Sequence, residues 1–183
     1  PGEEPIEGQM LAIKGSRFIT DDRGVALFKN VDKSEEGYKV DFGFASKIRG
    51  WVPSGGPVQI LKMTGNKTFF IPYKASKILN GQLKLELDDK SNLSFKLSNI
   101  KVTATIINQA DTLTYSTLTQ ENGEFYFNLP GGMYTISLSP LAFDDNFRPT
   151  TFSQQVDLVN NSEKMIYFDI KQRKRSINIK KRD

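Results

Sequence analysis

A motif that occurs twice, 99 residues apart, constrains the fold of this chain more than any other feature of its sequence. The pattern Thr-x3-Gly-x3-Phe begins at Thr20 and again at Thr119. In both copies a glycine and then a tyrosine follow, at Tyr38 and at Tyr134. Internal repeats at domain-sized spacing decide the architecture before any finer feature of the sequence.

The similarity of the two copies extends beyond the motif. Trp51 and Phe147 each lie 13 residues after the motif tyrosine, and each stands two residues before a proline. A chain of 183 residues is long enough for two small domains. We therefore expect a first domain over residues 1–79 and a second over residues 80–183.

Short alternating apolar runs, separated by turn residues, predict β-strands throughout. Leu83, Leu85 and Leu87 alternate with polar residues, and no segment keeps a helical period for more than two turns. The near-continuous apolar run from Met165 to Ile170 predicts a strand buried on both faces. The sequence predicts an all-β protein of two tandem β-sandwiches.

The composition excludes the commonest catalytic groups. The chain contains no cysteine and no histidine, which removes disulfides, thiol chemistry and the usual general base near neutral pH. It has no glycine-rich phosphate loop and no nucleophile elbow. We expect no enzyme, no catalytic residue and no cofactor. No apolar run approaches the length of about 18 residues that a membrane span needs.

The positive charge is concentrated at one end. Residues 171–183 carry seven lysines and arginines against one aspartate, so the charge of this segment is +6. The net charge of the whole chain is +4, so the remainder of the chain is slightly acidic. Nucleic acid is therefore not an expected partner. Within the segment, Ser176–Lys180 alternates like a strand. We favour an edge strand protected by lysine and arginine, with a docking strand or contact with an acidic envelope surface as the alternatives.

The two copies differ in length before the threonine. Gly81 precedes Thr119 by 38 residues, whereas Gly8 precedes Thr20 by only 12. Two strands and a turn are not expected to fit into 12 residues, so the first domain is predicted to lack a strand. Either that strand belongs to upstream sequence, which we favour, or a partner supplies it by edge pairing.

The second copy resembles a known family. The run T-Q-E-N-G-E-F-Y-F-N-L-P-G-G-M-Y-T-I, residues 119–136, resembles the central signature of carboxypeptidase regulatory-like domains. These domains are transthyretin-like, broadly immunoglobulin-like β-sandwiches related in shape to Cna-B repeats. The resemblance covers about residues 80–170. It is looser over 6–79, where residues 31–37 replace the compact Leu-Pro-x-Gly turn.

The resemblance implies a non-catalytic spacer or adhesive module. It places the module at the C-terminal end of a larger exported bacterial protein, secreted or held at the cell surface or in the periplasm. The implied partner is another protein, or the rest of the same polypeptide, contacted through an exposed sheet edge. The alternatives are a carbohydrate-binding module and an accessory domain of an upstream peptidase or glycosidase.

Three sets of residues are candidates for binding or chemistry. Trp51 and Phe147, with Tyr73, could form an aromatic platform for a glycan, although their recurrence in both copies favours a packing role. Asp144, Asp145 and Asn146 are candidate calcium ligands, but they fit no calcium-loop pattern, and such residues in turns usually cap backbone N–H groups.

The third candidate is an amide bond between Lys101 and Asp169, as some Cna-B domains form. It requires a buried carboxylic acid to move the proton. Residues 133–141, where that acid should lie, contain none. We favour a salt bridge or an exposed lysine.

Overall fold

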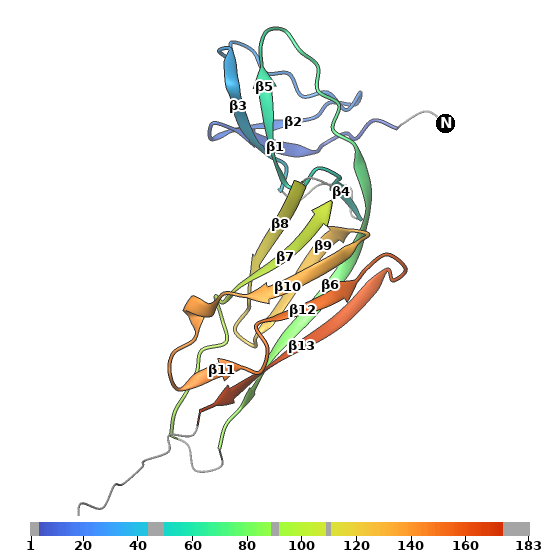
Figure 1. Ribbon diagram of the computed structural model, residues 1–183. Helices are drawn as coiled ribbons and strands as arrows, with labels where there is room; N and C mark the ends of the chain where they lie inside the picture. Colours follow the sequence, from blue (N-terminus) through green and yellow to red (C-terminus); the bar gives the residue numbers. More distant parts are fainter. Residues whose placement is uncertain (1–3, 44–49, 89–91, 109–110, 174–183) are drawn as a thin grey trace, which may run out of the picture. The chain divides into compact units, whose positions relative to one another are not determined.

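The computed structural model of the chain describes residues 4–43, 50–88, 92–108 and 111–173 (Figure 1). Its regular structure is made of β-strands apart from one short 3-10 turn, η1 (Pro140–Ala142), which confirms the expected all-β class. The strands are β1 (Met10–Ile13), β2 (Ser16–Ile19), β3 (Ser34–Asp41), β4 (Trp51–Pro53), β5 (Val58–Met63), β6 (Tyr73–Glu86), β7 (Lys101–Asn108), β8 (Asp111–Leu118), β9 (Glu124–Pro130), β10 (Met133–Leu138), β11 (Phe147–Pro149), β12 (Ser153–Asp157) and β13 (Glu163–Gln172).

The chain divides into two compact units. The N-terminal unit comprises Pro1–Lys77, Ile107–Tyr115 and Asn128–Gly132, and the C-terminal unit comprises Ile78–Ile106, Ser116–Phe127 and Met133–Asp183. One strand, β6, contributes its first residues to the N-terminal unit and its later residues to the C-terminal unit.

The N-terminal unit contains an antiparallel sheet with the strand order β2-β1-β3-β5. The hairpin between β1 and β2 turns at Lys14 and Gly15, whose φ angles of 48° and 80° are both positive, as a two-residue type I′ turn requires. One face of the sheet is apolar, and its buried residues are Leu11, Ile13, Tyr38, Val40 and Phe42.

This hairpin corrects the expectation that two strands and a turn cannot fit between Gly8 and Thr20. Two strands of four residues each, β1 and β2, lie within that interval. They fit because a two-residue turn adds almost no length to the connection. The strand that the first repeat lacks must therefore be a different one.

The C-terminal unit is a β-sandwich. One sheet has the order β12-β10-β7-β8, and the other is built from β11, β13, β6 and β9. Strands β9 and β10 alternate between buried and exposed residues, so each sheet gives one face to the core. Strand β13 also alternates, since Met165 and Tyr167 are exposed while Phe168 is buried. The expectation of a strand buried on both faces was wrong there, because no layer formed by the described residues covers its outer face.

Strand β6 lies between β13 and β9 in this second sheet. It runs parallel to β13, with Ile78 opposite Glu163 and Glu86 opposite Lys171. Gly81 is a necessary residue of β6, since a Cβ atom built on it would lie 2.1 Å from Cζ of Phe125 on β9. The Phe125 ring therefore packs directly on the backbone of β6.

Hydrogen bonds made by its hydroxyl explain why the motif begins with a threonine. In the C-terminal unit, Thr119 exchanges backbone hydrogen bonds with Ile100 and Asn99. Its Oγ1 accepts the N–H of Ile100 at 2.9 Å and donates to the carbonyl of Leu97 at 2.5 Å. Thr119 is only 3% exposed, and its bond to Ile100 satisfies a buried backbone N–H, while its bond to Leu97 is partly buried.

The N-terminal unit repeats the same set of bonds. Oγ1 of Thr20 accepts the N–H of Gln9 at 2.9 Å and donates to the carbonyl of Ile6 at 2.6 Å. The N–H of Thr20 donates to Gln9, and the carbonyl of Thr20 accepts the N–H of Gly8. We call each set the threonine clasp. It makes Gly8 equivalent to Asn99, and both have a positive φ, 73° and 61°.

The clasp aligns the strands of the two units. The sheet β2-β1-β3-β5 of the N-terminal unit corresponds to β8-β7-β10-β12 of the C-terminal unit. The antiparallel pair β4–β6, with Pro53 opposite Tyr73, corresponds to the pair β11–β13, with Pro149 opposite Ile170. Residues 68–73 are therefore equivalent to residues 165–170.

Replacing Thr119 with valine should destabilise the C-terminal unit by about 1–3 kcal/mol, because it leaves the Ile100 N–H buried without a partner and removes the bond to the Leu97 carbonyl. Urea unfolding followed by circular dichroism measures the change. The matched control is Thr135→Val, at an exposed position on β10, which should change stability by less than about 0.5 kcal/mol. Thr20→Val should have a smaller effect than Thr119→Val because Thr20 is only half-buried. Equal effects at Thr119 and Thr135 would contradict the role of the clasp.

Candidate functional site

The two units differ in one strand position. In the C-terminal unit, residues 78–86 of β6 lie between β13 and β9. Among the residues that the structure describes, no strand takes the equivalent position in the N-terminal unit, although Pro5 lies against Gly24 as Leu83 of β6 lies against Gly123. Its neighbours there would be residues 68–73, equivalent to β13, and residues 25–29, equivalent to the start of β9. We call this place the open strand position.

Both segments that border the open strand position lack regular pairing. Residues 25–29 and 67–72 belong to no strand, although their equivalents in the C-terminal unit form β9 and β13. A strand needs a hydrogen-bonded neighbour, and in the C-terminal unit β6 is that neighbour for both segments. The same sequence pattern therefore stays irregular in the N-terminal unit because its common partner is missing.

Apolar side chains remain uncovered beside the open strand position. Phe70 is 86% exposed, and Leu27 is 66% exposed. Ala26 and Phe28 are only half-buried, whereas their equivalents Phe125 and Phe127 lie in the core of the C-terminal unit at 2% and 5% exposure. Phe70 and Leu27 lie on the outer side like their equivalents Tyr167 and Tyr126, which are 44% and 57% exposed beside β6. Only the partial exposure of Ala26 and Phe28 therefore follows from the missing neighbour.

The sequence analysis expected a missing strand but did not identify the residues that border it. One signal was present in the alignment of the two copies. Ala26 stands where the second copy has Phe125, so the first copy lacks the ring that packs over the backbone of β6. This substitution indicates a missing strand only after the threonine clasp has fixed how the two copies align.

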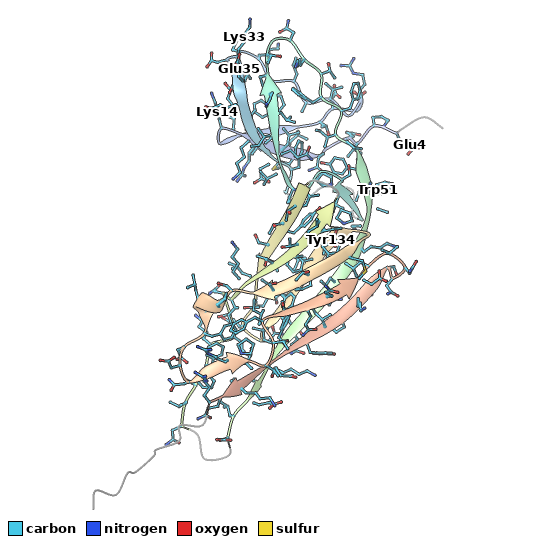
Figure 2. The ribbon with its side chains drawn as sticks, viewed as in Figure 1. Glu4, Lys14, Lys33, Glu35, Trp51 and Tyr134 are labelled. Atoms are coloured by element: carbon cyan, nitrogen blue, oxygen red, sulfur yellow. The ribbon has the colours of Figure 1, made fainter. Side chains whose placement is uncertain are left out.

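Two of the three aromatic candidates lie on one face of the β4–β6 pair. Trp51 is opposite Ala75 and Tyr73 is opposite Pro53, so Trp51 and Tyr73 occupy diagonal positions on the same side. Trp51 is 47% exposed (Figure 2). The Tyr73 hydroxyl is buried and has no hydrogen-bond partner among the described residues, and burial raises the pKa of Tyr73 to about 12.

Phe147, the third aromatic candidate, belongs to the core of the C-terminal unit. It is 2% exposed, and its ring centroid lies 5.0 Å from that of Phe95. A sugar cannot stack on a buried ring, so Phe147 takes the packing role that its recurrence in the two copies favoured. The platform hypothesis is thereby limited to Trp51 and Tyr73.

The acidic turn has a structural use. Oδ1 of Asp144 accepts the backbone N–H groups of Asn146 at 2.8 Å and of Phe147 at 3.0 Å. This is the capping role that aspartate often has in turns. Within the described ranges, no group of three or more histidine, cysteine, aspartate or glutamate residues is arranged to hold a metal ion. Asp145 stands exposed in the same turn.

The structure offers no support for an amide bond between Lys101 and Asp169. Both residues are exposed, Lys101 on β7 and Asp169 on β13, and these strands belong to different sheets. The buried polar residues among those described are Gln9 and Thr119, so no buried carboxylic acid is present there to catalyse the reaction.

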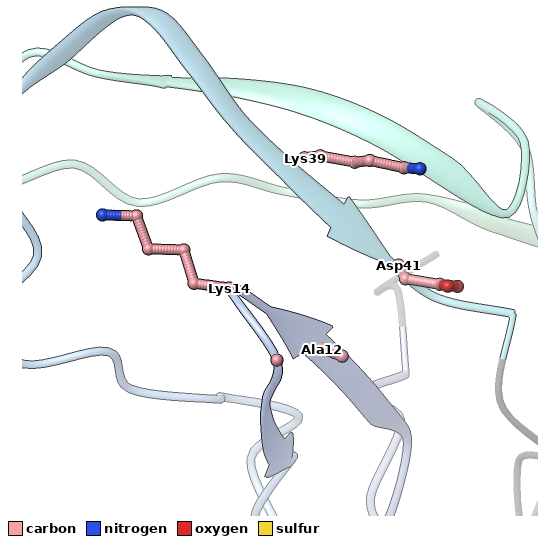
Figure 3. A pocket seen from close by; sticks show the side chains of 5 residues that line it. Ala12, Lys14, Lys39 and Asp41 are labelled. Carbon is pink, nitrogen blue, oxygen red and sulfur yellow. The ribbon is translucent and has the colours of Figure 1, made fainter.

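A shallow hollow on the outer face of β1 and β3 has a volume of about 370 Å³ and is lined by Ala12, Lys14, Gly15, Lys39 and Asp41 (Figure 3). Its charged groups do not converge. Lys14 extends away from Lys39 and Asp41 (Figure 3), and its Nζ lies 4.4 Å from the centroid of the Tyr38 ring. The hollow therefore presents no combined site for a ligand.

No protein-family profile matches the chain, and no curated protein matches it in sequence. Among solved structures, the chain is similar to the Bacillus anthracis TIE protein, with 18% identity and a TM-score of 0.38 over 92% of this chain and 31% of that one. It is similar to a DUF3823 family protein from Bacteroides uniformis, with 17% identity and a TM-score of 0.37 over 52% of this chain and 43% of that one. It is also similar to GBS52, the minor pilin of Streptococcus agalactiae, with 14% identity and a TM-score of 0.41 over 97% of this chain and 88% of that one. The chain thus spans less than half of the first two proteins.

None of the helical structure in the described ranges is long and apolar enough to cross a membrane.

Tyr73 should remain a neutral phenol well above pH 10, since its pKa is raised to about 12 by burial. Unfolding returns the group to a pKa of about 10. The unfolded state then releases a proton that the folded state keeps, so the N-terminal unit should lose stability as the pH rises from about 10 to about 12. Ultraviolet absorbance of the phenolate measures the titration. Tyr73→Phe is the control and should remove one late-ionising phenol, while Tyr115, whose pKa is also raised by burial, remains. Ionisation of Tyr73 near pH 10 in the folded chain would contradict the burial of its hydroxyl.

Proposed function

We propose that the chain is a non-catalytic spacer module of a bacterial cell-envelope protein, built to carry tension along the polypeptide. The observation that carries this proposal is the parallel pairing of β6 with β13 in the C-terminal unit. The resemblance of residues 119–136 to repeats of exported bacterial proteins supplies the envelope location, at the cell surface or in the periplasm.

The parallel pair decides how tension is distributed. The C-terminal unit begins at Ile78, in β6, and its last described strand, β13, ends at Gln172. In a parallel pair these two points lie at opposite ends of the ladder. Tension between them shears the nine paired positions together, whereas an unzipping force would break them one after another.

Side chains brace both ends of the ladder. Nδ2 of Asn80 donates to Oε1 of Glu163 at 2.7 Å at one end, and Nζ of Lys171 lies 3.1 Å from Oε2 of Glu86 at the other. Between them, Nζ of Lys84 lies 3.6 Å from the centroid of the Tyr167 ring. The Lys171–Glu86 pair is more than half exposed, so its contribution to stability is small.

The use of the buried polar groups also supports a structural role. Thr119 is occupied by the clasp, and Nε2 of Gln9 donates to the carbonyl of Met10. Polar groups that serve the fold in this way are not arranged around a reacting centre. A partner would then be another protein or a further part of the same polypeptide.

Single-molecule pulling tests the proposal, since the chain has no cysteine and handles can be placed at will. Cysteines at Lys77 and Arg173 load the β6–β13 ladder in shear. Cysteines at Lys77 and Ser162 load it from one end, because the Ile78 N–H donates to the carbonyl of Ser162 there. The C-terminal unit should unfold at a clearly higher force with the first pair. Equal forces in the two geometries would show that the ladder is not a mechanical clamp.

Glycan binding is a second candidate function, favoured by the half-exposed Trp51 beside Tyr73. A sugar could stack on the indole ring, since aromatic side chains offer flat apolar faces with polar rims. Trp51 is also the single tryptophan, so its fluorescence reports directly on this surface.

If the surface binds glycans, a glycan array should show signals that disappear in Trp51→Ala, and titration of a positive glycan should change the tryptophan fluorescence of the wild-type chain. Tyr126→Ala is the matched control, because Tyr126 is an exposed aromatic residue in the other unit. Equal loss in both variants, or no array signal, would remove this candidate.

A further inference from the structure

We propose that Asn122 is a site of spontaneous covalent modification, at which its side-chain amide closes onto the backbone nitrogen of Gly123 and is then hydrolysed to aspartate and isoaspartate. The co-reactant is water, and the reaction needs no enzyme. It is least hindered where glycine follows asparagine, because glycine carries no side chain beside the attacking nitrogen. The inference does not depend on the tension-bearing role.

The fold itself requires the glycine of this pair. Gly123 has a φ of 82°, a conformation that residues with a side chain rarely adopt. A Cβ atom built on it would lie 3.0 Å from the carbonyl oxygen of Leu83. A bulkier residue that would shield the backbone nitrogen is therefore not tolerated here.

The asparagine side chain is held over the same peptide bond. Oδ1 of Asn122 accepts the N–H of Glu124 at 3.0 Å, so the side chain forms an Asx turn that spans Gly123. This turn brings Cγ of Asn122 toward the nitrogen of Gly123. The same hydrogen bond polarises the amide carbonyl and stabilises the negative charge that develops on Oδ1 during the attack. Asn122 thus presents an activated carbonyl carbon beside the nitrogen that attacks it.

Water and hydroxide supply everything that the reaction consumes. The Gly123 nitrogen loses its proton to hydroxide and forms a bond to Cγ of Asn122, and the bond from Cγ to Nδ2 breaks. Nδ2 takes a proton from water and leaves as ammonia, which gives a cyclic succinimide. Water then adds to either ring carbonyl. Cleavage of the new bond to Cγ gives aspartate, and cleavage of the original peptide bond gives isoaspartate, in which the chain continues through the side chain.

One hydrogen bond must open before the attack. The N–H of Gly123 donates to the carbonyl of Gln120 at 3.0 Å, and the N–H of Gln120 donates to the carbonyl of Glu124 at 2.7 Å. These bonds belong to a turn in which Gln120, Glu121 and Asn122 are all exposed. Hydroxide reaches such a turn directly, and exposed turns open at little cost in free energy.

The other asparagine–glycine pair of the chain, Asn80 with Gly81, is protected. It lies inside β6, where Gly81 is opposite Ile166 in the parallel ladder with β13. Nδ2 of Asn80 donates to Oε1 of Glu163 at 2.7 Å, so the side-chain amide is held toward the neighbouring strand. Ring closure at Asn80 requires the ladder to open over several residues, which costs far more free energy than opening a turn.

The first copy of the repeat meets the same backbone need without a reactive pair. Val25 is equivalent to Glu124, and its N–H donates to Oδ1 of Asp21 at 2.8 Å. Arg23 stands at the position of Asn122. Of the two equivalent turns, only the one in the C-terminal unit therefore carries the modification site.

The two products have different effects on the fold. Aspartate keeps a side-chain oxygen that can accept the N–H of Glu124. Isoaspartate adds a methylene group to the backbone of the turn immediately before Gly123. The carbonyl of Gly123 accepts the N–H of Leu83 at 3.0 Å and so joins this turn to β6. Isoaspartate should therefore loosen the junction between β9 and β6.

Peptide mapping by mass spectrometry on the full chain, aged in mildly alkaline buffer, follows both pairs at once, since each conversion replaces NH₂ with OH. In concentrated urea both asparagines should react at similar rates, because each precedes glycine. In the folded chain Asn122 should react at least about tenfold faster than Asn80, because only Asn80 needs a ladder to open. Labelling with an isoaspartyl methyltransferase should locate isoaspartate at position 122. Equal rates at the two sites in the folded chain, or conversion in urea with none at Asn122 in the folded chain, would overturn the proposal.

A transplanted turn provides the matched control. Gln120→Asp together with Asn122→Arg copies the arrangement of Asp21 and Arg23, in which the cap does not come from the residue before the glycine. The double variant should fold like the wild type and form no isoaspartate on ageing. Hydrogen exchange at the Leu83 amide should become faster in the aged wild type and stay unchanged in the aged variant. Equal acceleration in both chains would show that the loosening does not arise from Asn122.

Discussion

The hydrogen-bond requirement of the β6 backbone organises the C-terminal unit. A buried strand must have partners on both sides, and β6 finds them in β13 and β9. Its parallel ladder with β13 extends over nine positions and joins two parts of the sequence about 85 residues apart. The core of the unit forms where this pair and β9 turn their apolar faces toward the sheet β12-β10-β7-β8. Where the same partner is missing, in the N-terminal unit, two equivalent segments form no strand.

The all-β class and most strands were predictable from alternation, because inward-facing residues such as Phe125 and Phe127 recur with period two. Sequence reasoning failed where a feature depended on the length of a turn or on the elements packed around a residue. The tight hairpin at Lys14 and Gly15 was missed because it needs positive φ at a lysine, which sequence patterns seldom reveal. The recurrence of Trp51 and Phe147 favoured packing for both, but it could not show that Phe147 is buried while Trp51 is 47% exposed, because burial depends on the layer packed above each ring. The open strand position was inferred, but from an incorrect equivalence between Gly8 and Gly81.

The threonine clasp shows why the repeat is visible in the sequence at all. Six residues of otherwise different segments, including Gln9 and Ile100, are held by the same backbone contacts around Thr20 and Thr119. The side chains of those partners can vary because their backbone groups make the bonds, whereas the hydroxyl cannot be replaced by an apolar group without loss. A short motif therefore persists while the sequences around it diverge.

Gly81 has a consequence for repeats that lie in tandem on one chain. Neighbouring similar domains can exchange strands while they fold, and such misassembly is a common hazard of repeat proteins. The Phe125 ring leaves space only for a strand with a glycine at its centre. A strand with a bulky residue at that point is rejected by steric clash, which is discrimination by exclusion rather than by attraction. The hydrogen atom that serves as the Gly81 side chain thus makes the C-terminal unit selective for its own strand.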